Sequence, residues 1–337
     1  MALRSVIIGA GFMGRRHIAS VKNAESYELC GISDLNPEAL ALAAKEGIDE
    51  RFCFTNTEQM LDDIKPDFAL ISTTAPSHFP LAKLAVEKGV KLLLVEKPFC
   101  VSIQQAVALR ELCAKAGVRL AVNHGIRFDR HYMQAREIAL REELGPITSV
   151  TLVGGNMGLA MNISHQLELF RLMTGQPIST VRAWLMDDPC PNPRGIQFHD
   201  GAGRVMAENA AGQRFYADVS PDQYHGLHML ITTRYAQIDI DFFTRKTIIN
   251  RRREDQLANP SSRYGSPFVC EECELTAPFD THVRTLEALA AGENYPDGEM
   301  GERIVRTLVA MWVSHENDHV SVNVDGPLPE DRIFSWA

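Results

Sequence analysis

The chain has 337 residues, of which 45% are hydrophobic and 23% are charged. This composition excludes a disordered or collagen-like protein, and at roughly 100–200 residues per domain the length predicts two domains. There are 34 Lys and Arg residues against 43 Asp and Glu, a formal net charge of −9. Such an acidic balance argues against general binding to nucleic acid or to an anionic membrane.

The cysteines and the apolar runs indicate the compartment. Seven cysteines are an odd number in a large chain, which predicts reduced thiols rather than a disulfide framework. The longest fully apolar runs have only a few residues, for example Leu92 to Val95, and are too short to span a bilayer. The apolar run after Ser5 has the length of a strand and not of a secretory signal. We therefore expect a cytoplasmic protein.

The first part of the chain, residues 1–123, alternates short apolar runs with helical patterns. The expected strands are 6–10, 27–33, 67–73, 91–95 and 119–123, and the expected helices are 12–22, one that begins at 37, 77–88 and 102–116. Alternation of this kind predicts a Rossmann-type doubly wound parallel sheet with helices on both faces.

The pattern changes in residues 124–337. Alternating apolar runs dominate at 147–153, 181–185, 214–219, 227–232 and 235–242, and helical patterns at 129–143, 164–173, 280–291 and 300–313. Consecutive strands with short connections predict an α+β domain with a large open, mainly antiparallel sheet. The polar stretch 251–273 is expected to form a long loop.

A glycine motif directly follows the first expected strand. Gly9, Gly11 and Gly14 form a G-x-G-x-x-G run that opens the first helix, and Asp34 stands 20 residues after Gly14. In a βαβ unit these glycines permit a tight turn, close approach of a pyrophosphate and close helix–strand packing, while the acidic residue binds the ribose. The alternative is a tight turn without a ligand, with Asp34 capping the next helix.

Asp34 also bears on the choice of cofactor. Its carboxylate would repel a ribose 2′-phosphate, and the next residue is Leu35 rather than an arginine, which favours NAD over NADP. Arg15 and Arg16 keep NADP open, because either guanidinium is able to bind a phosphate.

Three further segments accompany the glycine loop: Thr73 to His78, Glu96-Lys97-Pro98 and Asn123 to Phe128. With these segments the chain resembles the Gfo/Idh/MocA family of dehydrogenases, which includes glucose-fructose oxidoreductase and inositol dehydrogenase. The resemblance implies that the substrate binds between the open sheet and the nicotinamide, and that the protein forms homodimers or homotetramers.

The resemblance also implies a set of cofactor-binding residues. They are Gly9, Gly11, Phe12, Met13, Gly14, Asp34, Thr73, Thr74, Pro76, His78, Glu96, Lys97, Asn123 and Arg127. Two of them have a structural alternative: His78 as a histidine at a helix start, and Arg127 as a member of an ion pair.

Lys97 is the first candidate catalytic residue. It directly follows an expected parallel strand, and ligands of open parallel sheets bind at the carboxyl ends of the strands. An ammonium at that place is able to hydrogen-bond a substrate hydroxyl and favour its alkoxide as hydride leaves. The alternative is a surface lysine before a turn; Glu96 is expected to orient Lys97 or contact the cofactor.

His165 is the candidate general acid/base, because an imidazole suits proton exchange with a hydroxyl. Its segment resembles the family pattern D-x-G-x-H-x-x-D, but Met161 and Ile163 replace the first aspartate and the glycine, and Glu168 replaces the last aspartate. Asn162 is an expected substrate contact together with Lys97 and His165, although its amide cannot take a proton. The alternative for His165 is a satisfied histidine at a helix start.

Two other clusters are discounted. The pair Cys270 and Cys273 lacks a second pair, so no metal site is expected. Arg251 to Arg253 is interpreted as a solvated loop, with binding of a nucleotide-linked sugar as the alternative.

Together these features predict an NAD(P)-dependent oxidoreductase that acts on the CH–OH group of a sugar, a nucleotide-linked sugar or a cyclitol. Two alternatives stay open. One is a cofactor-binding regulator without catalysis, and the other is a redox-assisted elimination of the glycosidase kind.

Overall fold

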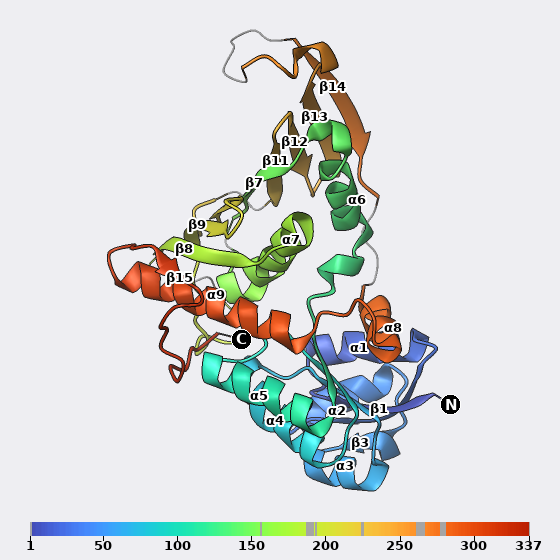
Figure 1. Cartoon of the computed structure of the whole chain (residues 1–337). Helices are drawn as coiled ribbons and strands as arrows, with labels where there is room; N and C mark the ends of the chain where they lie inside the picture. The colour runs from blue at the N-terminus through green and yellow to red at the C-terminus, as the bar shows by residue number, and fades with distance from the viewer. Residues whose placement is uncertain are drawn as a thin grey trace.

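The computed structural model describes residues 2–155, 157–186, 192, 194–223, 226–260, 267–276 and 281–336. It consists of an N-terminal domain with a parallel sheet and a C-terminal domain with a second, larger sheet (Figure 1). Both sheets agree with the fold class that the sequence predicts.

The N-terminal sheet has six strands in the order β3-β2-β1-β4-β5-β6, and every neighbouring pair is parallel. The strands are β1 (Leu3–Ile8), β2 (Tyr27–Ser33), β3 (Cys53–Phe54), β4 (Phe68–Ile71), β5 (Leu92–Val95) and β6 (Arg119–Val122), and the helices are α1 (Phe12–Asn23), α2 (Pro37–Lys45), α3 (Thr57–Ile64), α4 (Ala75–Glu87) and α5 (Ile103–Ala116). This is the strand order of a dinucleotide-binding fold.

Local signals explain most of these boundaries. The Asn36 side chain accepts a hydrogen bond from the Glu38 backbone N–H at 2.9 Å and so caps α2. Ser102 caps α5 in the same way, and α5 ends at Gly117 with a φ of 69°. The sequence did not predict β3 and α3, because a strand of two residues leaves no alternating pattern.

The C-terminal sheet has nine strands in the order β14-β13-β12-β11-β7-β10-β9-β8-β15. They are β7 (Ile147–Val153), β8 (Ile178–Leu185), β9 (Gly203–Asn209), β10 (Arg214–Asp218), β11 (His228–Thr233), β12 (Ala236–Asp241), β13 (Lys246–Arg252), β14 (Phe268–Glu274) and β15 (Val322–Asn323). Among the strands that the structure describes, only β7 and β10 of this sheet pair in parallel, so the prediction of a mainly antiparallel sheet is confirmed.

The prediction of a loop over 251–273 is wrong at both ends. Arg251 and Arg252, interpreted as part of a solvated loop, belong to β13. β14 begins at Phe268 and pairs with β13 along seven residues. In β14, glutamates stand beside both Cys270 and Cys273, and these charges mask the alternation of apolar residues that would predict a strand. β14 lies at the edge of the sheet, where charged side chains protect against pairing with a further strand. Residues 261–266 of the same stretch lie outside the described residues.

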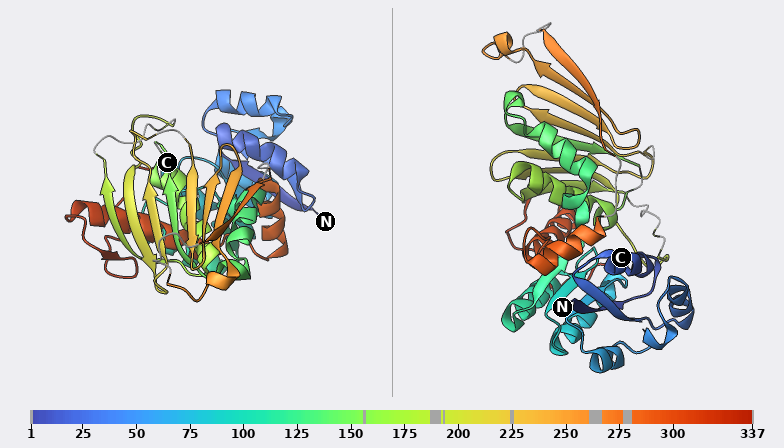
Figure 2. Two further views of the ribbon diagram at one scale, coloured as in Figure 1. Left: turned by 90° about the horizontal axis from the view of Figure 1, so that it is seen from above. Right: turned by 90° about the vertical axis from the view of Figure 1, so that its right-hand side faces the viewer.

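Helices cover one face of the large sheet (Figure 2). They are α6 (Arg130–Ala139), α7 (Ser164–Thr174) and α9 (Gly298–Glu316), whereas α8 (His282–Ala291) returns to the N-terminal domain and packs against α1. The helix predicted from 280 begins in the described residues at His282.

α9 joins the two domains. It contacts β8 of the large sheet as well as α5 and β6 of the N-terminal domain. A Cβ atom at Gly301 would lie 2.4 Å from Cγ2 of Val122, so only glycine allows this approach of helix and strand. The Val122 N–H also donates to the carbonyl of Pro296, just before α9, at 2.7 Å.

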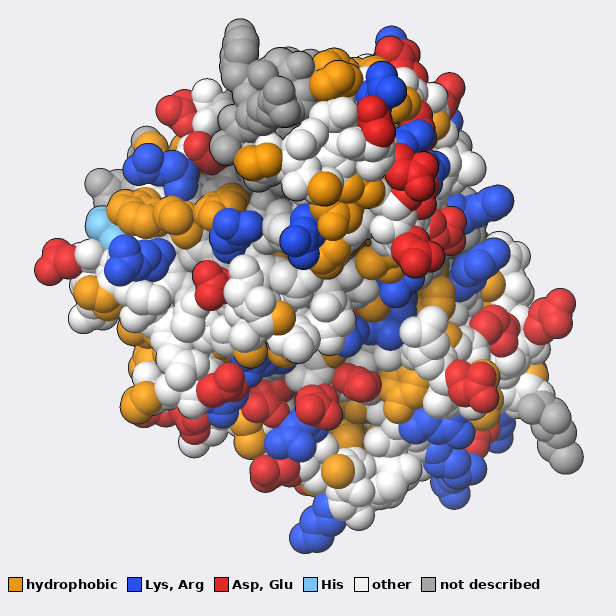
Figure 3. All heavy atoms as spheres, turned by 45° about the horizontal axis from the view of Figure 1, so that its top comes forward, with side chains coloured by type: hydrophobic (Ala, Val, Ile, Leu, Met, Phe, Trp, Pro, Cys, Tyr) orange, Lys and Arg blue, Asp and Glu red, His pale blue; other side chains and the backbone are white. Residues whose placement is uncertain are grey.

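The surface agrees with the charge balance of the sequence. On the face shown in Figure 3, Lys and Arg side chains are interspersed with Asp and Glu. Among the described helices, none combines the length and the apolar character that crossing a membrane requires.

Candidate active site

The glycine motif lines a cleft of about 1190 Å³ at the carboxyl ends of β1, β2, β4 and β5. Gly9 has a φ of +104°, and a Cβ at Gly14 would lie 1.9 Å from the Gly9 carbonyl oxygen, so the turn itself requires both glycines. A Cβ at Gly11, in contrast, would meet no protein atom within 4 Å. Gly11 therefore keeps open a space in the cleft that a side chain would fill.

This space fits a pyrophosphate. Gly11 is the residue before α1, it provides no side-chain cap, and the first turn of α1 contains no acidic residue. The backbone N–H groups of that turn therefore lack a side-chain acceptor, which is the usual arrangement of a phosphate site at a helix N-terminus. Phe12 and Met13 of the same turn also line the cleft.

Asp34 lies in the same cleft, directly after β2. Its carboxylate accepts hydrogen bonds from the Ala10 N–H at 2.7 Å and from the Asn36 N–H at 2.8 Å. The cap of α2 is Asn36 rather than Asp34, so the capping alternative does not account for the carboxylate. An anion at this place favours a ribose diol over a 2′-phosphate.

The residues after β4 divide into two groups. Thr73 and Thr74 line the cleft, whereas Pro76 lies in the first turn of α4 and is not part of the lining. His78 is buried beneath the turn. Its Nδ1 lies 3.0 Å from the Pro98 carbonyl oxygen, and its Nε2 lies 3.1 Å from that of Thr73. His78 therefore joins the two loops that border the cleft.

Glu96 and Lys97 follow β5, and their charges attract each other. Glu96 is buried and accepts hydrogen bonds from His17 Nε2 and Asn123 Nδ2, both at 2.7 Å, and from the Lys97 N–H at 3.1 Å. Burial alone would raise the pKa of Glu96, but the hydrogen bond and the charge of His17, with that of Lys97, hold it well below its usual range. The site therefore retains a carboxylate beside the Lys97 ammonium.

Lys97 precedes a cis peptide bond to Pro98. Its Nζ donates a hydrogen bond to the Met161 carbonyl at 2.8 Å, which links the two domains. Burial lowers the pKa of Lys97, and the charge of Glu96 opposes this shift. The lysine is thus a partly buried cation with a counter-charge and not the surface lysine of the alternative interpretation.

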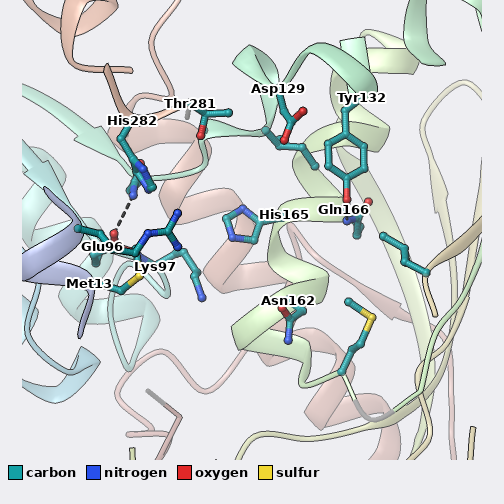
Figure 4. Close-up of a pocket in the computed structure, with 16 residues that line it drawn as sticks. Met13, Glu96, Lys97, Asp129, Tyr132, Asn162, His165, Gln166, Thr281 and His282 are labelled. Carbon is teal, nitrogen blue, oxygen red and sulfur yellow. Dashed lines mark hydrogen bonds between the residues drawn. The ribbon is translucent and has the colours of Figure 1, made fainter. Parts of the chain in front are cut away.

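A second cavity of about 350 Å³ adjoins the cleft. Met13, Glu96, Lys97 and Asn162 line both spaces. His165 lines the second cavity, where Figure 4 shows it between Lys97 and Tyr132. The geometry thus brings Lys97, Asn162 and His165 together where the two cavities meet.

His165 has a close histidine partner. Its Nδ1 lies 3.4 Å from Nδ1 of His124, a buried residue just after β6. Burial and the neighbouring Lys97 lower the pKa of His165 to about 3. The imidazole is consequently neutral at pH 7 and able to accept a proton.

Arg127 lies apart from both cavities. Its guanidinium pairs with Glu168 of α7 at 2.5 Å and donates to the carbonyl oxygens of Asn294 and Tyr295 at 3.2 Å. This is the structural ion pair left open in the sequence.

Sequence reasoning missed several residues of the second cavity. They are Asp129, Tyr132, Leu227, Thr281 and His282, with Met157. These residues come from distant parts of the chain and belong to none of the motifs, so only the fold assembles them.

Asp200 is a further residue without a sequence signal. It is 1% exposed and accepts hydrogen bonds from the backbone N–H groups of Ala160 at 2.8 Å and Met161 at 2.7 Å. Burial raises its pKa to about 6, against the opposing hydrogen bonds and the charge of Lys97. The carboxylate fixes the segment whose Met161 carbonyl holds Lys97.

Replacement of Asp200 by alanine is expected to lower both stability and kcat. Two buried N–H groups would lose their acceptor, at about 1–3 kcal/mol each, and the Met161 carbonyl would be free to leave Lys97. Denaturant unfolding and kcat are the measurements, with Asp63→Ala, an exposed position on α3, as the control. A kcat equal to that of the control would contradict a role in positioning Lys97.

Comparison with known proteins relates these features to a family. Residues 3–124 match the family GFO_IDH_MocA, described as an oxidoreductase family with an NAD-binding Rossmann fold. The chain is 33% identical to the D-apiose dehydrogenase of Paraburkholderia graminis over 41% of this chain and 36% of that protein. It is 30% identical to the UDP-N-acetylglucosamine 3-dehydrogenase of Acidithiobacillus ferrooxidans over 54% and 57% of the two chains. Each alignment thus covers less than two thirds of the relative.

The second domain is matched by solved structures. An oxidoreductase from Agrobacterium radiobacter, in complex with NAD+, L-tartaric acid and magnesium, superimposes with a TM-score of 0.79 over 96% of this chain and 99% of that chain. Its identity of 16% shows a common fold and no more. The expected NAD cofactor is confirmed by the match of residues 3–124, and over these residues the chain is similar to the Gfo/Idh/MocA oxidoreductases, as the sequence motifs indicate.

Proposed function

We propose that the protein is an NAD-dependent dehydrogenase that oxidises a carbinol carbon of a monosaccharide-like or cyclitol-like substrate, or reduces the corresponding ketone. The observation that carries the proposal is the position of Lys97, which lines both the cofactor cleft and the second cavity. The named activities of the sugar dehydrogenases among the relatives support the substrate class.

The proposed roles follow from the positions of the side chains. NAD, when bound, supplies the acceptor for a hydride. The Lys97 ammonium donates a hydrogen bond to the substrate oxygen and stabilises its developing negative charge, while Glu96 keeps the lysine charged. Neutral His165 receives the proton of the hydroxyl, and Asn162 orients the substrate through its amide.

The lining of the second cavity supports a polar substrate. Asp129, Gln166 and Thr281 offer acceptors and donors for several hydroxyl groups, and Tyr132 provides a ring face. About 350 Å³ suits a single sugar ring or cyclitol, whereas the nucleotide of a nucleotide-linked sugar would extend out of the cavity.

Formation of NADH tests the proposal. Purified protein is incubated with NAD or NADP and with D-apiose, myo-inositol or UDP-N-acetylglucosamine, and absorbance is followed at 340 nm. We expect turnover with at least one compound and a higher kcat/KM with NAD, because Asp34 disfavours the 2′-phosphate. Binding of NADH without any turnover would favour the regulator, and elimination products without net NADH would favour the glycosidase-like reaction.

We also propose that the uncovered face of the large sheet forms a homo-oligomer. Val153, Met206 and Ile248 are 41%, 46% and 39% exposed on β7, β9 and β13. The helices lie on the opposite face of the sheet, so a second copy of the chain would cover these side chains.

A further inference from the structure

Two histidines that are 41 residues apart in the sequence face each other at the site. His124 follows β6 of the N-terminal domain, and His165 lies in the first turn of α7. Their Nδ1 atoms are 3.4 Å apart, and their rings meet edge to face with centroids 5.1 Å apart. At this distance the two atoms share one hydrogen bond, so one Nδ1 carries a proton and the other accepts it.

The charges around the pair favour its neutral form. Lys97 and His282 contribute positive charge toward His165, and Lys97 and Arg127 do so toward His124, whereas Glu96 is the one carboxylate that acts on both rings. Burial lowers the pKa of both histidines. A doubly protonated pair would moreover place two N–H donors against each other.

The neighbourhood offers His165 no carboxylate in direct contact among the described residues. Met161 and Asn162 stand four and three residues before His165, and neither side chain is able to take a proton. The Asp200 carboxylate is bound to the N–H groups of Ala160 and Met161. The group that contacts the Nδ1 of His165 is therefore His124.

We propose that His124 is a positioning residue that orients His165 by accepting the hydrogen bond of its Nδ1–H. The Nε2 of His165 then presents a lone pair to the second cavity. During oxidation the substrate O–H bond breaks and its proton forms a bond to this Nε2, while the Nδ1–H remains on the bond to His124. This role rests on the proposed dehydrogenase function.

The arrangement has a consequence for pH dependence. Burial and the charge of Lys97 lower the pKa of His165, and a neutral imidazole partner offsets this less than a carboxylate would. The general base must be unprotonated, and the acid limb of kcat/KM is thus expected below pH 5. Replacement of His124 by aspartate places an anion beside His165, raises its pKa and is expected to move the acid limb up by at least about one pH unit.

Nitrogen NMR of the full chain tests the tautomer without any substrate. Histidines are labelled with 15N, and the signals of His165 are assigned by their loss in His165→Gln. We expect the Nδ1–H tautomer of His165 in the wild type and a large population of the Nε2–H tautomer in His124→Phe, which lacks the acceptor. An Nε2–H tautomer in the wild type would overturn the proposal.

Steady-state kinetics of His124 variants are the second test of the proposal. The substrate is whichever of D-apiose, myo-inositol and UDP-N-acetylglucosamine the wild type oxidises. We expect His124→Phe to lower kcat by at least about 10-fold with little change in KM, and His124→Asn, whose amide oxygen accepts a hydrogen bond, to restore most of the loss. An unchanged kcat in His124→Phe, or an unmoved acid limb in His124→Asp, would overturn the role. If no compound is oxidised, the dehydrogenase proposal fails while NMR still decides the hydrogen bond.

Discussion

Lys97→Met is expected to lower kcat by at least about 10²-fold, the size usually associated with loss of an acid/base group, while NADH still binds. Methionine matches the length of the lysine stem but provides no donor for the substrate oxygen. The carboxylate of Glu96 keeps its bonds to His17 and Asn123, so the border of the cofactor cleft is expected to persist. Steady-state kinetics and NADH fluorescence titration measure the two effects.

A matched control separates this effect from the loss of any lysine. Lys91 lies at the opposite end of β5, is 71% exposed at its side chain and pairs with Asp67. Lys91→Met is expected to leave kcat unchanged, because surface ion pairs contribute little. Equal kcat values for the two variants would contradict the catalytic role of Lys97.

Alanine substitutions of two glycines in the nucleotide loop are expected to differ in their effects on stability and on NADH binding. In Gly14→Ala the new Cβ would lie 1.9 Å from the Gly9 carbonyl oxygen, so the backbone must shift, and we expect a loss of stability of at least about 1–3 kcal/mol. In Gly11→Ala the Cβ meets no protein atom within 4 Å, and the loss is expected to stay below about 1 kcal/mol. Denaturant unfolding gives both values.

NADH binding discriminates further between the two variants. The Gly11→Ala methyl group enters the space that the pyrophosphate requires, so the Kd for NADH is expected to rise at least about 10-fold although the fold is retained. Wild-type affinity in Gly11→Ala would show that the dinucleotide does not approach this turn, and the proposed function would then lose its cofactor site.

The N-terminal domain was predictable because its signals are local. Buried parallel strands give continuous apolar runs, and Asn36, Ser102 and Gly117 mark helix ends by their own backbone chemistry. Glu96 and Lys97 were identified because they directly follow a parallel strand. The carboxyl ends of parallel strands form the edge of the sheet at which ligands bind. Asp34 was identified from its spacing to the glycines, and the structure indeed places it in the cleft.

The residues that complete the site were not predictable in this way. His124 and Asp200 act through partners 41 and 40 residues distant in the chain, and no periodicity encodes such contacts. β9 and β13 were missed because their outward positions carry charges and their inward positions include Gly203 and Thr247. The replacement of the first aspartate of the family pattern by Met161, in contrast, was visible in the sequence.

The long helix α9 has a mechanical consequence. It packs against the edge of the N-terminal sheet at Gly301 and extends along the large sheet, yet none of its residues lines the cofactor cleft or the adjoining second cavity. Lys97 and His165 belong to different domains. The packing of α9 against both domains therefore determines the distance between these two residues. Substitutions that weaken the packing of α9 would therefore change kcat without touching the site, because they alter how often Lys97 and His165 are correctly placed relative to each other.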